Sequence, residues 1–232
     1  MNISVVVCAK NEENYIKKCL QCLKKQTVKP EIIVVDGHST DDTYNIAKRY
    51  ANKVVKEKKR GIANARNLGW KTAKGDVVAY CDADCLPPKD WVEKITKLMK
   101  DNICIFGPII PYDAEITTEL GLKVWGDLFM RTVSKFDYPC ISASNAAFKR
   151  DVLKKHPFRL NFLEDFDLGN RLRKVGKVKC CKDLYMFISA RRFKKGFHRT
   201  AFKYYLLNYI RLKVFKKKQK TYSLGGNVGD EI

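Results

Sequence analysis

The sequence lacks an apolar run long enough to cross a membrane. None approaches the ~18 residues that a spanning helix needs, and the longest candidate lies at residues 103–111. The N-terminus also lacks the basic and apolar regions of a signal peptide, because Met1 and Asn2 lead directly into a strand-like segment. We therefore expect a cytoplasmic protein without a transmembrane helix.

Acidic residues are scarce. The chain has 25 Asp and Glu against 46 Lys and Arg, which gives a formal net charge of +21 at pH 7. The excess is uneven, since residues 191–220 contain twelve Lys or Arg and no acid. Such a concentration indicates an anionic partner: nucleic acid, a phosphorylated substrate or an anionic membrane surface. We treat residues 196–232 as a basic C-terminal extension.

Within this extension, residues 201–215 are mostly apolar or aromatic, with polar breaks at Lys203, Asn208, Arg211 and Lys213. The segment is too short and too charged to span a bilayer. Its polar breaks are spread around a helical wheel, so it is not a clean amphipathic helix. The pattern predicts an interfacial segment that holds the protein peripherally on the cytoplasmic face of a membrane. The alternative is a helix packed on its own domain with a solvated basic end.

The nine cysteines show no convincing metal-binding pattern. Cys19 and Cys22 have zinc-like spacing, but no second Cys or His pair follows, and both fall on or beside the apolar face of an expected helix. We therefore expect reduced core thiols. Hydrophobic residues make up 45% of the 232-residue chain, which predicts a globular protein with a full core.

The N-terminal half alternates strand-like and helix-like segments. Apolar runs at residues 3–8, 31–35, 54–55 and 77–81 are separated by stretches of helical period. Such alternation is typical of a largely parallel sheet, whose strand ends share one edge. We expect a set of polar residues to converge there on one ligand: Asp36, Arg60, Arg66, Asp82 and Asp84.

Two carboxylates follow the last of these strands. Asp82 and Asp84 lie one residue apart, between the buried run and Pro87. In an extended backbone, residues i and i+2 point the same way, and ligands of open α/β sheets bind beyond the carboxyl ends of the strands. Two hard oxygen ligands there suit Mg²⁺ or Mn²⁺ with a diphosphate. The simpler alternative is an Asp that caps the next helix.

Several segments, in order and spacing, resemble family 2 glycosyltransferases. In the N-terminal half these segments are residues 4–13, 33–43, 65–69 and 81–84. Further on, residues 144–150 resemble the acceptor-side strand of that family, residues 162–176 its Glu-Asp helix, and residues 190–193 its late Arg segment. The resemblance covers about residues 3–195.

The resemblance implies the GT-A fold, a Rossmann-like, mixed and mostly parallel sheet flanked by helices. A glycosyltransferase domain at 1–195 would divide into a nucleotide-sugar-binding half (1–100) and an acceptor half (101–195). The implied enzyme is an inverting hexosyltransferase that uses a UDP- or GDP-sugar and Mn²⁺ or Mg²⁺. The implied donor-binding residues are Ala9, Glu12, Asp36, Arg60, Arg66 and Asp82, and the implied metal ligands are Asp84 and Asp82.

One motif departs from the family pattern. The usual Asp-Asp-Gly-Ser is replaced by Asp36-Gly37-His38-Ser39. Asp36 is kept, and would accept a hydrogen bond from an N–H of the nucleobase. The second carboxylate is missing, so the base, uracil or guanine, stays open.

On the acceptor side, the resemblance implies that Asp165 is the general base and that Glu164 orients the acceptor hydroxyl or exchanges roles with Asp165. Both acids would also favour a helix N-terminus without any catalytic role. An acceptor phosphate, such as a polyprenyl phosphate, is already ionised and needs no base. Arg191 and Arg192 would then hold that phosphate. The acceptor, a glycan or a lipid-linked phosphate, stays open.

Two other functions deserve comparison. A nucleic-acid-binding protein would use the basic C-terminal segment and its aromatic side chains, but this leaves Asp82, Asp84 and Asp165 without a role, and we expect no nucleic-acid partner. A sugar-1-phosphate nucleotidyltransferase would need a Gly-rich basic loop after the first strand. Residues 9–13 are acidic there instead.

Overall fold

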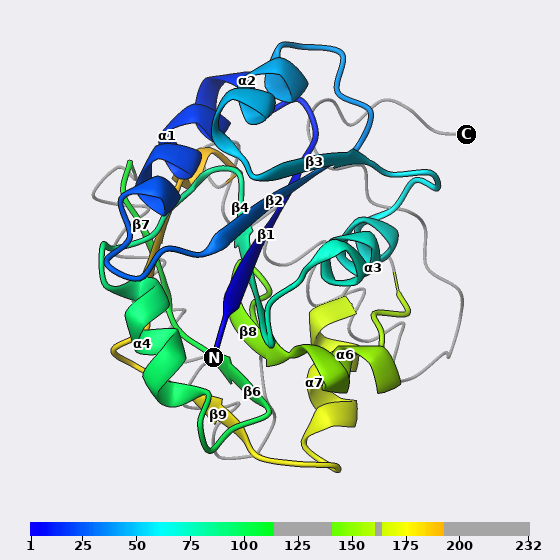
Figure 1. The fold of residues 1–232 in the computed structure, drawn as a ribbon, viewed down its shortest axis with the longest axis vertical. Helices are drawn as coiled ribbons and strands as arrows, with labels where there is room; N and C mark the ends of the chain where they lie inside the picture. The colour runs from blue at the N-terminus through cyan, green and yellow to red at the C-terminus, as the bar shows by residue number, and fades with distance from the viewer. Residues whose placement is uncertain (114–140, 161–163, 193–232) are drawn as a thin grey trace.

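The computed structural model describes residues 1–113, 141–160 and 164–192 (Figure 1). Its strands are β1 (Ile3–Ala9), β2 (Glu31–Asp36), β3 (Lys53–Lys56), β4 (Val77–Asp82), β5 (Cys85–Leu86), β6 (Cys104–Phe106), β7 (Ile109–Pro111), β8 (Asn145–Lys149), β9 (Val178–Cys180) and β10 (Met186–Ile188). Its helices are α1 (Glu13–Lys24), α2 (Thr43–Tyr50), α3 (Ile62–Thr72), α4 (Trp91–Leu98), α6 (Arg150–Lys155), α7 (Glu164–Leu172) and the short 3₁₀ helix η1 (Ala190–Arg192).

The main sheet has the order β3-β2-β1-β4-β8-β6-β9. The N-terminal strands β1 to β4 run parallel, whereas β8 pairs antiparallel with both β4 and β6. This mixed, mostly parallel sheet flanked by helices confirms the predicted fold class. The four expected N-terminal strands are present, each slightly longer than the apolar run that predicted it.

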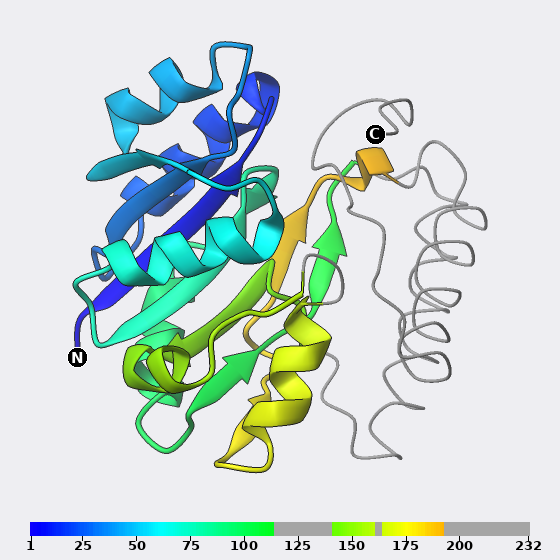
Figure 2. The same cartoon turned by 90° about the vertical axis from the view of Figure 1, so that its right-hand side faces the viewer.

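Helices cover both faces of this sheet (Figures 1 and 2). On one face, α1 and α4 pack through Ile16, Leu20 and Trp91 against inward side chains of β1 and β2. On the other face, α3, α6 and α7 pack through Trp70, Leu153 and Leu168. Because β1, β2 and β4 are covered on both faces, their residues are apolar at nearly every position. The polar site residues are therefore confined to the strand ends.

A second, small sheet has the order β5-β10-β7. In it β10 pairs antiparallel with β5 and parallel with β7. Figure 2 shows β10 leading into η1 beside β7. This sheet brings the late segment of the chain close to the end of β4.

The cysteines in the described ranges are all free thiols. Cys19 is fully buried in the core on α1, as expected, and Cys22 is half-buried beside it. Among helices within the described residues, none is long and apolar enough to cross a membrane. The segment 201–215, for which membrane binding is predicted, lies outside the described residues.

Candidate active site

The strand register brings the predicted polar residues to one edge. Cys8 lies opposite Asp82 in the β1–β4 pairing, and Ala9 lies opposite Asp36 in the β1–β2 pairing. The ends of β1, β2 and β4 are therefore level, and the loops that follow them share the carboxyl edge of the sheet. Ligands of open α/β sheets bind at this edge.

The first cluster of the site surrounds the guanidinium of Arg191. Its Nη2 lies 2.5 Å from Glu12 Oε1 and 3.0 Å from Asp84 Oδ2, and its Nε donates to the same Asp84 oxygen at 3.1 Å. The Tyr15 ring lies against it, with the guanidinium carbon 4.3 Å from the ring centroid. Asp84 is only 3% exposed. Two buried carboxylates thus converge on one positive group.

Backbone contacts fix both sides of this cluster. The N–H of Ser189 donates to the carbonyl of Asp84 at 3.2 Å, so β10 and the β4–β5 turn are joined directly. Asp113 accepts from the hydroxyl of Ser189 and from the N–H of Ala190. On the opposite side, the N–H of Glu12 donates to Thr43 Oγ1 at 2.7 Å, which ties the loop after β1 to the start of α2.

Arg66 is the centre of a second cluster. It is 6% exposed and forms a 2.5 Å ion pair from Nη1 to Glu164 Oε1, with Nη2 3.9 Å from Asp82 Oδ1. Asp82 also accepts from the hydroxyl of Ser144 at 2.6 Å. The predicted donor residue Arg66 therefore contacts Glu164, one of the two predicted acceptor-side acids.

The structure separates Asp82 from Asp84 by their partners. Strand β4 ends at Asp82, and Ala83 and Asp84 form a turn before β5. The prediction that Asp82 and Asp84 point the same way required an extended backbone through both residues. The strand ends at Asp82, so this requirement is not met. Asp82 contacts Ser144 and Arg66, whereas Asp84 contacts Arg191.

The two acids at the start of α7 have different environments. Glu164 is buried, and burial raises its pKa to about 7 although the charge of Arg66 opposes the shift. Asp165 accepts from the N–H of Ala143 at 3.1 Å and from its neighbour Phe166 at 2.9 Å. Burial also raises the pKa of Asp165, against the opposing charge of Arg66.

The remaining predicted donor residues lie near the ends of β2 and β3. Asp36 is fully buried, and both of its carboxylate oxygens lie 3.3 Å from the N–H of Ser39. Arg60 is exposed in the loop that precedes α3. Arg192 has its backbone in η1, and its side chain lies outside the described part of the structure.

Sequence reasoning missed several contacts in the site. Ser144 on Asp82, Tyr15 against Arg191 and Asp113 on Ser189 were not predicted. Ser144 belongs to a segment that resembles the family, so its motif was visible although its role was not. No local sequence pattern marks Asp113 as a site residue, because its partner Ser189 lies 76 positions away in the chain.

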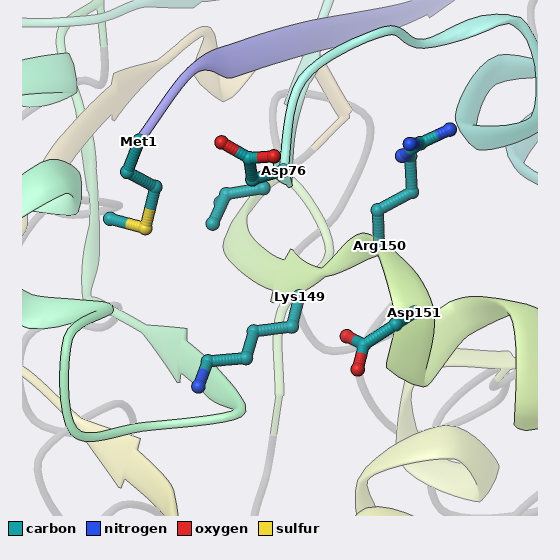
Figure 3. Close-up of a pocket in the computed structure, with 6 residues that line it drawn as sticks. Met1, Asp76, Lys149, Arg150 and Asp151 are labelled. Carbon is teal, nitrogen blue, oxygen red and sulfur yellow. The ribbon is translucent and has the colours of Figure 1, made fainter.

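A pocket of about 260 Å³ lies elsewhere, at the opposite edge of the sheet (Figure 3). It is lined by Met1, Asp76, Val77, Lys149, Arg150 and Asp151. Val77 begins β4, so this pocket is a strand length away from the carboxylates that end the strand. At the carboxyl edge itself, Arg66 is ion-paired with Glu164 and Arg191 with Asp84.

Solved structures share this architecture. A mannosyltransferase from Pyrobaculum calidifontis in complex with GDP-Man and Mn²⁺ aligns with a TM-score of 0.69 at 24% identity, over 85% of this chain and 59% of that one. S. aureus TarS residues 1–349 in complex with UDP-GlcNAc aligns with a TM-score of 0.64 at 21% identity, over 82% and 58%. The likeness establishes the GT-A fold.

The sequence comparisons give the family. The family model described as Glycosyl transferase family 2 matches residues 4–156, more than half of the chain, and the chain belongs to this family. An uncharacterized glycosyltransferase of Haemophilus influenzae is 33% identical over 198 residues, which cover 75% of this chain and 61% of the relative. Glycosyltransferase AglE of Haloferax volcanii is 33% identical over 101 residues, or 40% of this chain and 33% of AglE. The chain thus matches only about a third of the length of AglE.

Proposed function

We propose that the chain is a nucleotide-sugar-dependent, inverting glycosyltransferase that uses a divalent cation, Mn²⁺ or Mg²⁺. The observation that carries the proposal is the convergence of Glu12 and Asp84 on one nitrogen of Arg191, beyond the carboxyl edge of the sheet. Membership of the family supports it. The similar structures of TarS, in complex with UDP-GlcNAc, and of the Pyrobaculum mannosyltransferase, in complex with GDP-Man and Mn²⁺, support the same donor class.

The donor set of the first cluster fits a hard cation. Glu12 and Asp84 offer carboxylate oxygens, which Mg²⁺ and Mn²⁺ prefer, and both already bind a positive group. Within the described ranges, no three His, Cys, Asp or Glu side chains are grouped to hold a metal ion by themselves. We therefore expect the donor's diphosphate to complete the ligand set. A bound cation would neutralise the charge that develops on the leaving diphosphate.

The contacts of each residue support the other donor roles that we propose. Arg191 touches the same two carboxylates, which favours a role in binding the donor's phosphates. Asp82 touches Ser144 and Arg66, which favours a role toward the ribose or a water on the cation. Asp36, at the end of β2, is proposed to accept from the nucleobase.

On the acceptor side, Asp165 is proposed as the general base. A neutral acceptor hydroxyl must lose its proton as it attacks the anomeric carbon, and a carboxylate with a raised pKa is a better base for that proton. Glu164 is ion-paired with Arg66, so its proposed role is to position the acceptor hydroxyl.

A polyprenyl-phosphate acceptor would not need Asp165. Its phosphate would be bound by Arg192, since Arg191 lies with the donor carboxylates.

The test measures how an Asp84→Asn variant binds UDP and GDP, the nucleotides that the donor releases. Asn keeps the size of the side chain but removes the charge that a cation needs. In thermal-shift titrations, UDP or GDP with Mn²⁺ should stabilise the wild-type protein, and the variant should lose that Mn²⁺-dependent shift. Asp101→Asn, at an exposed acid away from the site, is the matched control. If Asp84→Asn binds Mn²⁺ and nucleotide as well as the wild type, the metal assignment is wrong.

A further inference from the structure

Glu57 is a buried acid that no step of the proposed reaction uses. It lies directly after β3 and is 6% exposed. Its N–H donates to the carbonyl of Asp36 at 3.0 Å, so the ends of β2 and β3 are joined at this residue. The backbone of Gly61, the N-cap residue of α3, is among the groups that favour the ionised form of its carboxylate. Burying a carboxylate is costly, and the fold gives this one a fixed position at the ligand-binding edge.

The carboxylate of Glu57 lies over Gly37. A Cβ added to Gly37 would be 3.6 Å from Glu57 Oε1, and 3.5 Å from the carbonyl of Ala9. Gly37 stands where the usual Asp-Asp-Gly-Ser motif has its second Asp. The acid missing from β2 is thus matched by an acid from β3, which reaches the same place from the neighbouring strand.

We propose that Glu57 is a specificity-determining residue that supplies the second carboxylate of the nucleobase site and thereby favours guanine over uracil. The proposal rests on the proposed function. Guanine presents two adjacent donors, N1–H and the N2 amino group, whereas uracil presents one N–H between two carbonyls. Asp36 and Glu57 together offer two acceptors, which match the guanine edge. A site that bonds a polar group discriminates strongly against a ligand that lacks it.

Nearby positive charges favour the ionised form of Glu57, which is the form that accepts hydrogen bonds with both oxygens. His38, Lys10 and Arg60 are the basic groups that act on it and favour its ionised form, although burial raises its pKa overall. His38 has a left-handed φ of 60°, a conformation uncommon for a residue other than glycine.

The first experiment measures the affinity of Glu57→Gln for GDP, UDP and pyrophosphate, each with Mn²⁺, by calorimetry. Gln keeps the shape but removes the charge and leaves one acceptor oxygen in place of two. We expect GDP to bind about tenfold to a hundredfold more weakly, as for loss of a charged hydrogen bond, with UDP less affected and pyrophosphate unchanged. Glu93→Gln, on the exposed face of α4, is the matched control. An unchanged GDP:UDP ratio, or an equal loss for pyrophosphate, would overturn the proposal.

A second experiment tests whether Glu57 and position 37 share one place. Gly37→Asp adds a second acid beside Glu57 and should weaken GDP binding through repulsion. In the double variant Gly37→Asp/Glu57→Ala, the new Asp replaces the lost carboxylate, and GDP affinity should return to within about threefold of the wild type. Simple additivity of the two single changes would contradict the shared place. Failure of the wild type to bind any nucleoside diphosphate would instead refute the proposed function.

Discussion

At the scale of single residues, Arg66 joins the proposed donor and acceptor sides of the site, since it contacts both Asp82 and Glu164. Its guanidinium is ion-paired with Glu164 and faces Asp82, and its carbonyl accepts from the hydroxyl of Tyr80 at 3.0 Å. The rings of Tyr80 and Phe158 lie 6.0 and 5.7 Å from its guanidinium carbon. A buried charge held on several sides has little freedom to move, so Asp82 and Glu164 keep a fixed relation to each other.

Glu164 should give the folded protein a characteristic pH dependence. Burial raises its pKa from the ordinary 4.5 to about 7. Between these values the folded state binds more protons than the unfolded state, so the free energy of unfolding falls as pH rises through this window. Glu164→Gln cannot ionise and lacks this contribution. Urea unfolding at a series of pH values should show the wild type losing stability relative to the variant as pH rises from 4.5 to about 7.

The comparison between the two proteins is needed because other acids also contribute to the pH dependence of stability. Asp165 also has a raised pKa, and it contributes to both curves. A difference between wild type and Glu164→Gln that stays constant with pH would mean that the ion pair with Arg66 outweighs burial and keeps Glu164 ionised throughout.

Replacement of Asp165 should distinguish the two acceptor classes. With a hydroxyl acceptor, Asp165→Asn should lose about 10²-fold or more in turnover, because a positioned base contributes about that much. Donor affinity should change little. With a polyprenyl-phosphate acceptor the loss should be much smaller, and Arg192→Ala should have the larger defect. The measurement is steady-state kinetics with both acceptors.

Asp167→Asn is the control for this experiment, since Asp167 lies on the same helix but pairs with Arg171. Full turnover of Asp165→Asn with a hydroxyl acceptor would remove the proposed base.

The positions of Asp82 and Asp84 at the end of a strand were predictable from the sequence, but the residues that they contact were not. Asp82 ends an apolar strand and Asp84 follows it, and that position alone places both at the carboxyl edge of the sheet. Their partners come from distant segments: Arg191 is 107 positions from Asp84, and Ser144 is 62 positions from Asp82. No local pattern encodes such contacts, because they depend on how β8 and β10 pair with the rest of the chain.

At the scale of elements, the placement of α3 depends on its close approach to β1. A Cβ on Gly69 would lie 2.3 Å from Cγ1 of Val6, a fully buried and β-branched side chain. Gly69→Ala therefore has to push α3 away from the sheet, and α3 carries Arg66. We expect the variant to lose about 1–3 kcal/mol of stability, as overpacked cores do, together with affinity for nucleotide.

The measurement is chemical unfolding of Gly69→Ala beside Val6→Ala and the double variant. Val6→Ala makes room for the added methyl group, so the double variant should be more stable than the sum of the single effects predicts. Strict additivity would show that α3 is not held by this contact.

Element prediction succeeded for the four N-terminal strands and failed for the strands of the small sheet. The runs that predicted β1, β2 and β4 are buried on both faces, so nearly every residue in them is apolar. Strands β5, β7 and β10 contain two or three residues each, too few for a periodic pattern. They exist because they pair with one another, and β10 through this pairing delivers Arg191 to Asp84.

At the scale of the whole molecule, the alternating pattern predicted the fold class because each βα unit adds a parallel strand. The antiparallel strand β8 between β4 and β6 was not predictable in direction, since an apolar run is the same read either way. The division into halves at residue 100 and the boundary near 195 stay predictions. So does the role of the basic C-terminal segment, which lies beyond the described residues.

That segment leads to a prediction about the whole chain. The net charge is +21, and residues 191–220 contribute twelve positive charges without an acid. Each basic residue near an anionic surface contributes about 1 kcal/mol, so half of the cluster would give several kcal/mol. Tyr204, Tyr205 and Tyr209 are amphipathic and suit the headgroup region. Because a polyprenyl-phosphate acceptor would lie in a membrane, binding to that surface would bring the enzyme to its substrate.

Flotation with anionic and with neutral liposomes tests this prediction. The full chain should float with anionic vesicles at low salt and less as salt rises, because screening weakens exposed charges beyond about 10 Å at 0.1 M. Deletion of residues 202–220 should abolish flotation. Replacement of Lys216, Lys217, Lys218 and Lys220 by Gln leaves the tyrosines in place and separates charge from aromatic contact. If the full chain and the deletion variant float equally, the segment does not bind membranes, and a helix packed on its own domain becomes the better interpretation of residues 201–215.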